Sequence, residues 1–373
     1  MKSSWYWFAR LRERYRYKMD RIVFVIPDMP GGGTERVVAY LTNEYCKREI
    51  PVTILLFAGQ EVAYPLDERI EVVSVGTPSK GSARARIERI CRMRQFYRKN
   101  PNCRIWAFSV MGAVFSVIAA LGQKHFFLVS ERNDPNQYDH KRIRNLAYRF
   151  ADVVVCQTPD AAKSFPKGIA RKAVVIPNPI VVEGIVPYEG IREKRIVAVG
   201  RLNPQKNHRL LINAFSIFAK KHDDYILELY GKGELEEELK LYAEELGLAD
   251  KVILKGFSAH VKEEINRAAM FVLSSDYEGI SNSMAEAIAL GVPTIATDCP
   301  IGGSKMLIRD HCNGILVPVG DDEALAAAMC ELAENPELGL KLSREGRKLS
   351  EENTVSQIAD RFLAADTRKR RTD

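Results

Sequence analysis

The feature that most constrains the fold is an alternation of short apolar runs with helical segments, which starts again in the second half of the chain. In the first half the apolar runs cover residues 21–27, 52–57, 70–75, 104–109, 126–130, 152–157 and 173–176, and in the second half 195–199, 225–230, 252–254 and 270–273. Short apolar runs between helices are typical of buried strands in parallel sheets. The sequence therefore predicts an α/β fold with two Rossmann-like, doubly wound units.

The length and one irregular segment indicate where the chain divides. At 373 residues it is long enough for two domains of ordinary size. Residues 177–194, PNPIVVEGIVPYEGIREK, are rich in proline and glycine and form the best candidate hinge. The predicted parts are a basic aromatic extension (1–20), a first domain (21–185), a second domain (186–355), and a C-terminal helix with a basic tail (356–373) that packs back toward the first domain.

Cysteine usage and hydropathy indicate a cytoplasmic protein. The seven cysteines are scattered and form no CxxC pair, so neither a disulfide framework nor a metal or redox motif is indicated. The longest apolar run, residues 106–121, is shorter than the roughly 20 residues that a membrane span needs. No secretory signal precedes the first strand.

The stretch from Ser274 to Cys299, SSDYEGISNSMAEAIALGVPTIATDC, combines a strand end, a polar loop and a helix start. Ser283 and Glu286 have the spacing of a capping box. Glu278 lies in the loop, with seven residues between it and Glu286, so both carboxylates can face one ligand beside amides suited to phosphate. The alternative is a capping residue and a solvated loop charge.

Three further loops follow predicted strands and are candidate ligand contacts. The loop GGGTER (31–36) allows close approach to a ligand, but it matches neither common phosphate-loop pattern. Arg201 and Lys206 can grip a diphosphate, Arg through its planar fork and Lys as a point charge. The segment GKGE (231–234) lacks the third glycine of a dinucleotide fingerprint, which makes NAD binding improbable. The alternative for each is an ordinary tight or solvated turn.

Two segments of the first half are strongly basic. Residues 1–20 place aromatic side chains on one helical face among arginines, and residues 82–98 carry many arginines against the single acid Glu88. An anionic membrane surface suits both segments. Nucleic acid is the rival partner for the second segment, but no recognisable binding motif accompanies it. A solvated face or an extension without a role is the remaining alternative.

Taken in order, the motifs resemble those of a known enzyme family. They are GGGTER, VGRLNPQKN, YGKGE, LKGF, DYEGISNSMAEAIALGVPTIATDCPIGG and NGILVPVGDDEALAAAM. This series, which spans about residues 21–365, is similar to the retaining glycosyltransferases of family 4, and its order is far more specific than any one motif. The resemblance implies the GT-B fold, in which two Rossmann-like domains face a central cleft.

The resemblance also assigns roles to residues. Arg201 and Lys206 would stabilise the donor diphosphate as the leaving group. Glu278 would contact the transferred sugar, and Glu286 would hold the ribose hydroxyls; Glu278, Arg201 and Lys206 form the expected catalytic set. The other expected donor contacts are Gly32, Gly33, Gly231, Gly233, Gly256, Phe257, Asn282, Ser283 and Met284.

The sequence departs from the family at one position. Many relatives place a His or Asp after the fourth strand of the first domain, where this chain reads AFSVMGA. Glu131 and Arg132 in SERNDP are the expected substitutes for acceptor-side contacts. A dedicated side-chain base is not required if a donor phosphate oxygen takes the acceptor proton. The chain has no DxD triplet, so neither a metal-bridged diphosphate nor another cofactor is expected.

The expected function is transfer of a hexose or N-acetylhexosamine, with retention, from a nucleotide sugar such as a UDP-sugar. The basic, aromatic first half favours a lipid-linked glycan acceptor in the synthesis of capsule, exopolysaccharide or O-antigen, at the inner face of the cytoplasmic membrane. Nucleic acid is not an expected partner. The alternatives are a sugar-nucleotide epimerase of the same fold and a non-catalytic protein that binds sugar nucleotides.

Overall fold

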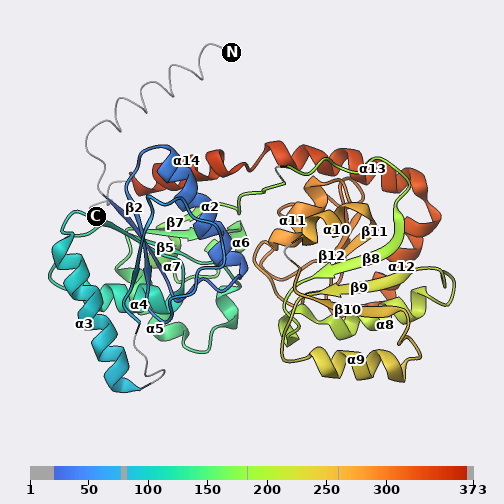
Figure 1. Cartoon of the computed structure of the whole chain (residues 1–373), viewed down its shortest axis with the longest axis horizontal. Coiled ribbons are helices and arrows are strands. Elements are labelled where there is room, and N and C mark those ends of the chain that lie inside the picture. Colours follow the sequence, from blue (N-terminus) through green and yellow to red (C-terminus); the bar gives the residue numbers. More distant parts are fainter. Residues whose placement is uncertain (1–20, 77–81, 183, 259, 368–373) are drawn as a thin grey trace, which may run out of the picture.

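The computed structural model describes residues 21–76, 82–182, 184–258 and 260–367. Figure 1 shows two lobes side by side; the first is built from residues up to about 180 together with the C-terminal helix, and the second from the residues between them. The predicted extension (1–20) and the last six residues of the basic tail (368–373) lie outside the described residues.

The first lobe is built on a parallel sheet of seven strands in the order β3-β2-β1-β4-β5-β6-β7. The strands are β1 (Ile22–Ile26), β2 (Val52–Leu56), β3 (Glu71–Ser74), β4 (Arg104–Ala107), β5 (Phe127–Ser130), β6 (Val153–Cys156) and β7 (Ala173–Val175). All seven lie within or against the predicted runs. The central strands are fully buried because helices cover both faces of the sheet.

Helices of the first lobe divide between the two faces. One face is covered by α2 (Gly33–Lys47) together with the C-terminal helix α14 (Val355–Asp366). The other is covered by α3 (Ala83–Lys99), α4 (Val110–Ala119) and α5 (Lys141–Arg149), with the short α6 (Pro159–Lys163) and α7 (Lys167–Ala170).

The second lobe repeats this plan with a parallel sheet of six strands in the order β10-β9-β8-β11-β12-β13. The strands are β8 (Glu193–Val199), β9 (Ile226–Tyr230), β10 (Val252–Gly256), β11 (Ala268–Leu273), β12 (Thr294–Thr297) and β13 (Ile315–Val317). The sequence predicts the first four of these strands but not β12 and β13, which are four and three residues long.

Helices also cover both faces of the second sheet, which buries two apolar clusters. They are α8 (His208–Phe218), α9 (Glu236–Glu245), α10 (Val261–Arg267), α11 (Asn282–Ala289), α12 (Asp322–Glu334) and α13 (Pro336–Arg347). The loops after β8, β9 and β11 emerge at the carboxyl edge of the sheet, where open parallel sheets bind ligands.

The chain returns from the second lobe to the first through α14, which packs on α2. Phe362 stacks on Trp106 of β4, with ring centroids 5.6 Å apart. The Trp106 indole N–H donates to Asp366 at 3.1 Å, and Arg104 pairs with the same carboxylate. Within the described part of the chain, no helix combines the length and the apolar character needed to cross a membrane.

Candidate active site

The helix α11 starts two residues earlier than predicted. The N-cap of α11 is Ser281, whose hydroxyl accepts from the Met284 amide at 3.4 Å. The predicted capping box of Ser283 and Glu286 is therefore wrong. Ser283 lies inside the first turn and donates to the Val199 carbonyl at 3.0 Å. Glu286 is therefore the fifth residue of α11 and not the third.

Glu286 is buried and pairs with cations from both lobes. Arg36, in the first turns of α2, reaches its two carboxylate oxygens at 2.9 and 3.1 Å. Lys262 of α10 lies 3.6 Å from one of them. Burial opposes the charge on Arg36, but Glu286 and Tyr64 outweigh it and raise the pKa of the guanidinium. The Glu286 carboxylate is therefore held in place by ion pairs with both lobes.

Glu278 forms the second ion pair of the site, with Lys206 of the loop after β8. Both side chains are largely buried, and the Ser275 hydroxyl contacts the same carboxylate oxygen at 3.4 Å. The two members of the predicted catalytic set that come from different loops therefore meet. The Gln205 side chain, which donates to the Tyr277 carbonyl at 3.0 Å, ties these loops together.

Arg201, the third member of the set, is exposed at the same edge. Its carbonyl accepts from Nε2 of His208 at 3.3 Å. Glu35 of α2, in the first lobe, lies close enough to Arg201 to interact with its charge. Burial raises the pKa of the Glu35 carboxyl, against the opposing effects of its own backbone amide and of the positive charge on Arg201. Near the start of α2, the Glu35 carboxyl group therefore lies close to Arg201, and the Arg36 guanidinium pairs with Glu286.

The glycine loop before α2 lies directly against α11. The Asn282 side-chain amide donates to the Gly33 carbonyl at 3.1 Å, and a Cβ on Gly33 would lie 3.2 Å from the same nitrogen. The Tyr64 hydroxyl donates to the Gly31 and Gly32 carbonyls at 2.7 and 3.0 Å. The N-terminal ends of two helices therefore meet where the lobes join, and both favour an anion beside them.

The loop GKGE after β9 packs against the loop that carries Arg201. A Cβ on Gly231 would lie 1.8 Å from the Gly200 carbonyl oxygen, and one on Gly233 would lie 2.1 Å from the Leu202 oxygen. These glycines are thus required by close contact with the loop that carries Arg201. Gly256, with φ of +67°, accepts from the Gly231 amide through its carbonyl at 2.8 Å.

The remaining predicted donor residues differ in exposure. Phe257 is 68% exposed beside Gly256, which leaves its ring available to a ligand. Met284 is fully buried, and its amide is already bound by Ser281. Of the three α11 amides expected at the phosphate, only those of Asn282 and Ser283 lie ahead of this capping bond.

The two predicted acceptor-side residues have different positions. Glu131 is buried within the first lobe, where the hydroxyls of Tyr138 and Tyr148 donate to its carboxylate at 3.2 and 3.0 Å. Burial raises the pKa of this carboxyl. The expectation that Glu131 contacts an acceptor is therefore corrected, because its oxygens point into the lobe.

Arg132 instead lies at the junction of the lobes. Its guanidinium donates to the Asn178 side chain, while its Nε and one terminal nitrogen are buried without a partner among the described residues. Burial lowers the pKa of Arg132 to about 10, and the charge of Glu131 opposes that change. Donors left unpaired in this way favour an anion or an oxygen-rich group.

Asn178 is a residue that the sequence analysis missed. Its side-chain oxygen accepts from Arg132 and from Gln157 at 2.5 Å, and its amide donates to Ile280 and Asn282 at 3.0 and 2.5 Å. The only signal was its position between two prolines in the predicted hinge. Asn178 links the ends of β5 and β6 to the start of α11.

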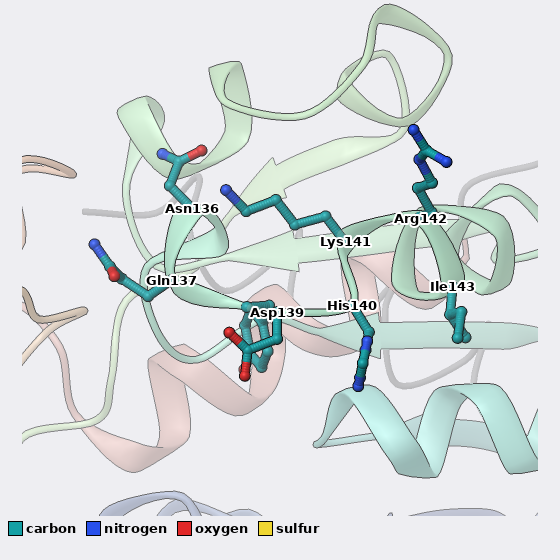
Figure 2. Close-up of a pocket in the computed structure, with 8 residues that line it drawn as sticks. Asn136, Gln137, Asp139, His140, Lys141, Arg142 and Ile143 are labelled. Atoms are coloured by element: carbon teal, nitrogen blue, oxygen red, sulfur yellow. The ribbon is translucent and has the colours of Figure 1, made fainter.

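A hollow of about 650 Å³ lies beside the loop after β5, away from these ion pairs, and none of the predicted donor residues lines it. Figure 2 shows Lys141 and Arg142 extending from the opposite side of the chain to His140 and Ile143. The side chains diverge, so the hollow lacks the convergent polar groups of a built ligand site.

The charged groups of the site are arranged as a sugar nucleotide would require. Cations of the second lobe, two helix N-termini and two carboxylates meet at the carboxyl edges of two parallel sheets. Such groups can neutralise a diphosphate and hold sugar hydroxyls. Two Rossmann-like lobes that meet in this way define the class of GT-B glycosyltransferases.

Comparison with solved structures supports this class. The fold is similar to that of Anabaena HepE in complex with UDP and glucose, with a TM-score of 0.81 and 20% identity over 92% of this chain and 98% of that one. The family model for glycosyl transferases group 1 matches residues 189–349, and the model for glycosyltransferase family 4 matches residues 31–183. The chain belongs to this family of glycosyltransferases.

Two curated relatives match over nearly the whole chain. An uncharacterised glycosyltransferase of Haemophilus influenzae is 25% identical over 92% of this chain and 99% of its own length. A Campylobacter jejuni α-1,4-N-acetylgalactosaminyltransferase that acts on a diphospho-undecaprenol-linked acceptor is 24% identical over 92% of this chain and 98% of its own.

Proposed function

We propose that the chain is a retaining glycosyltransferase that moves a hexose or N-acetylhexosamine from a UDP-sugar to a lipid-linked glycan. One observation carries the proposal: Lys206 and Glu278 form a pair beside the start of α11, where Glu286 pairs with Arg36 of the first lobe. A donor diphosphate between α2 and α11 would reach Arg201 and Lys206, and its sugar would reach Glu278.

The proposed chemistry needs few groups from the protein. The bond between the anomeric carbon and the diphosphate oxygen breaks, and the acceptor oxygen bonds to the same face of that carbon. The acceptor proton passes to a donor phosphate oxygen. Arg201 and Lys206 stabilise the charge on the leaving diphosphate, an effect that is often worth about 3 kcal/mol per donor. No metal or other cofactor takes part in the proposed step.

The relatives support the choice of donor and acceptor. HepE, which shares the fold, is described in complex with UDP and glucose. The Campylobacter relative acts on a glycan carried by diphospho-undecaprenol. We extend both properties to this chain, and we place the protein peripherally at the inner face of the cytoplasmic membrane, in the synthesis of a cell-surface polysaccharide.

Thermal-shift measurements against a panel of nucleotide sugars provide the first test. A ligand that binds only the folded state raises the melting temperature according to its occupancy. We expect UDP and one UDP-sugar to raise it, and Arg201→Ala to abolish the shift without lowering the melting temperature of the free protein. No shift with any UDP compound would contradict the proposed donor.

Incubation with the UDP-sugar selected by this panel then separates transfer from epimerisation. A transferase without acceptor releases UDP slowly by hydrolysis, whereas an epimerase returns an isomerised UDP-sugar. Glu278→Gln is expected to lower the rate of hydrolysis about 100-fold or more if Glu278 contacts the transferred sugar. Unchanged turnover in this variant would remove Glu278 from the site.

A further inference from the structure

We infer that the outer surface of α3, α4 and α5 is the face with which the protein docks on an anionic lipid bilayer. This inference rests on the proposed lipid-linked acceptor, because it names the surface that brings such an acceptor to the cleft. The three helices pack side by side over one face of the first sheet and lie together on the first lobe. The outer sides of the three helices therefore adjoin one another.

Large apolar side chains are exposed along all three helices. Between 42% and 63% of each of these side chains is accessible: Ile87, Met111, Ile118, Leu121, Ile143, Leu146 and Phe150. Ile143, Leu146 and Phe150 recur at helical spacing, and so do Met111, Ile118 and Leu121. Scattered exposed apolar residues are ordinary, but rows on neighbouring helices mark an interaction surface.

The same surface is strongly cationic. Its exposed basic residues without an acidic partner in the described part of the chain are Arg84, Arg86, Arg98, Lys99, Lys124, Lys141, Arg142 and Arg149. The only acid in the three helices is Glu88, and it is paired with Arg92. Arg94 and Arg89 are not part of the charge offered to solvent, because Arg94 binds carbonyls near the end of α4 and Arg89 is buried against Phe115.

Exposed apolar and basic side chains together favour an anionic bilayer over other partners. The headgroup region of an anionic bilayer accepts apolar side chains and attracts cations at the same depth. A nucleic acid would engage the cations but leave the apolar rows exposed, since its backbone offers them no contact. A second copy of the chain would bring two cationic surfaces together. We define the docking face as these seven apolar and eight basic residues.

The direction in which the three helices run relates the docking face to the acceptor. Helices that follow parallel strands begin at the carboxyl edge of the sheet, so Arg84, Met111 and Ile143 lie in the first turns at that edge. A bilayer in contact with this end of the face would present a lipid-linked glycan beside the cleft. Docking thereby shortens the path of an acceptor that cannot leave the membrane.

Co-sedimentation of the full chain with vesicles tests the inference. The probe is a vesicle of phosphatidylglycerol and phosphatidylcholine, compared with phosphatidylcholine alone. Replacing Arg84, Arg86, Lys99 and Arg149 with Gln is expected to weaken binding to the anionic vesicle about 100-fold or more. The matched control replaces Lys220, Lys240, Lys341 and Arg344 of the second lobe with Gln and is expected to keep binding within about 3-fold.

A second variant tests the apolar rows. Ile87→Ser, Met111→Ser and Leu146→Ser together keep every charge, and we expect them to abolish the binding that persists in 0.5 M salt, where screening leaves mainly apolar contacts (about 4 Å Debye length). All variants should hydrolyse the UDP-sugar at the wild-type rate. Loss of vesicle binding with intact hydrolysis supports the docking face.

Other outcomes contradict the inference. Binding by the docking-face variants equal to wild type would assign membrane contact to another part of the chain. A wild-type dimer that the apolar variant converts to a monomer would assign the face to a second copy. Absence of UDP-sugar turnover in every variant, with vesicle binding lost only in the docking-face variants, would contradict the proposed enzyme activity and leave the docking face standing.

Discussion

At the scale of single residues, the candidate site is a set of charges that neutralise one another across the cleft. Glu286 is held by Arg36 of the first lobe, and Glu278 by Lys206 of its own lobe. The carboxylates expected to bind a sugar nucleotide are therefore already oriented by cations. Positioning of this kind reduces the reorganisation that ligand binding requires.

Arg36 is the residue whose role can be tested most directly. Arg36→Met leaves Glu286 with Lys262 alone, and we expect the KM for the donor to rise about 10-fold with kcat within about 2-fold, the loss of one charge-assisted contact in binding. Arg36→Lys should restore part of the affinity. Arg48→Met, at the other end of α2, is the control with unchanged KM. A lower KM in Arg36→Met would mean that Arg36 competes with the donor for Glu286.

His208 predicts a pH dependence of stability. Burial, together with the charge of Lys206, lowers its pKa to about 4, against the opposing hydrogen bond with the Arg201 carbonyl. Between pH 6.5 and 4 the unfolded chain binds a proton that the folded chain excludes, so the free energy of unfolding falls as the pH falls through this window. The full effect is about 3 kcal/mol.

Urea unfolding at pH 7 and pH 4.5 measures this dependence. His208→Gln, whose amide can still donate to the Arg201 carbonyl, should lose less stability between the two pH values than the wild type. His260→Gln is the matched control, since the His260 side chain is 83% exposed, and should follow the wild type. An equal loss in His208→Gln would show that other groups cause the acid sensitivity.

At the scale of elements, the loop after β8 is shaped by the loop after β9. Gly233 has no room for a side chain because the Leu202 carbonyl occupies that space. The cation-bearing loop therefore depends on a glycine that need not touch the ligand. The tight turn inferred from GKGE is present, but its nearest neighbour is another loop of the protein.

Gly233→Ala should consequently displace the Arg201 loop. We expect a loss of about 1 to 3 kcal/mol in the free energy of unfolding, as in other overpacked sites. The KM for the donor should rise in the same variant because Arg201 and Lys206 are shifted. Gly168→Ala is the control, as no atom lies within 4 Å of the added carbon. Unfolding curves that superimpose with wild type would refute the packing argument.

At the scale of the whole molecule, α14 belongs to the second half of the chain but completes the core of the first lobe. Tyr45 of α2 donates to the Ala359 carbonyl at 2.9 Å, and Arg48 pairs with Asp360. The C-terminal segment thus ties the two lobes together. Together with the Asn178 contacts, it limits how the cleft can open.

Phe362→Ala tests the contribution of this helix. The ring is fully buried and stacks on Trp106 and Phe108, so its removal should cost about 3 to 5 kcal/mol in the free energy of unfolding. Leu340→Ala, at a side chain 72% exposed on α13, is the control with a change below about 0.5 kcal/mol. A small effect in Phe362→Ala would mean that α14 is dispensable for the first lobe.

The sequence by itself determined the alternation of strands and helices, the two-lobed class of fold and the family. These depend on local periodicity and on short motifs that can be read from a single sequence, such as Glu278 and Glu286 at fixed spacing. The strands β12 and β13 were not predicted because β12 (TIAT) contains two threonines among its four residues and β13 has only three residues.

Only the tertiary structure decided which charges meet. Glu286 looked like a helix cap from its spacing, yet Arg36, 250 residues away in the chain, is its partner. Glu131 and Arg132 are neighbours in sequence, but successive residues after a strand can point in opposite directions, and only Arg132 reaches the junction of the lobes. Long-range contacts of this kind have no local signature, because the fold of both lobes must be complete before they exist.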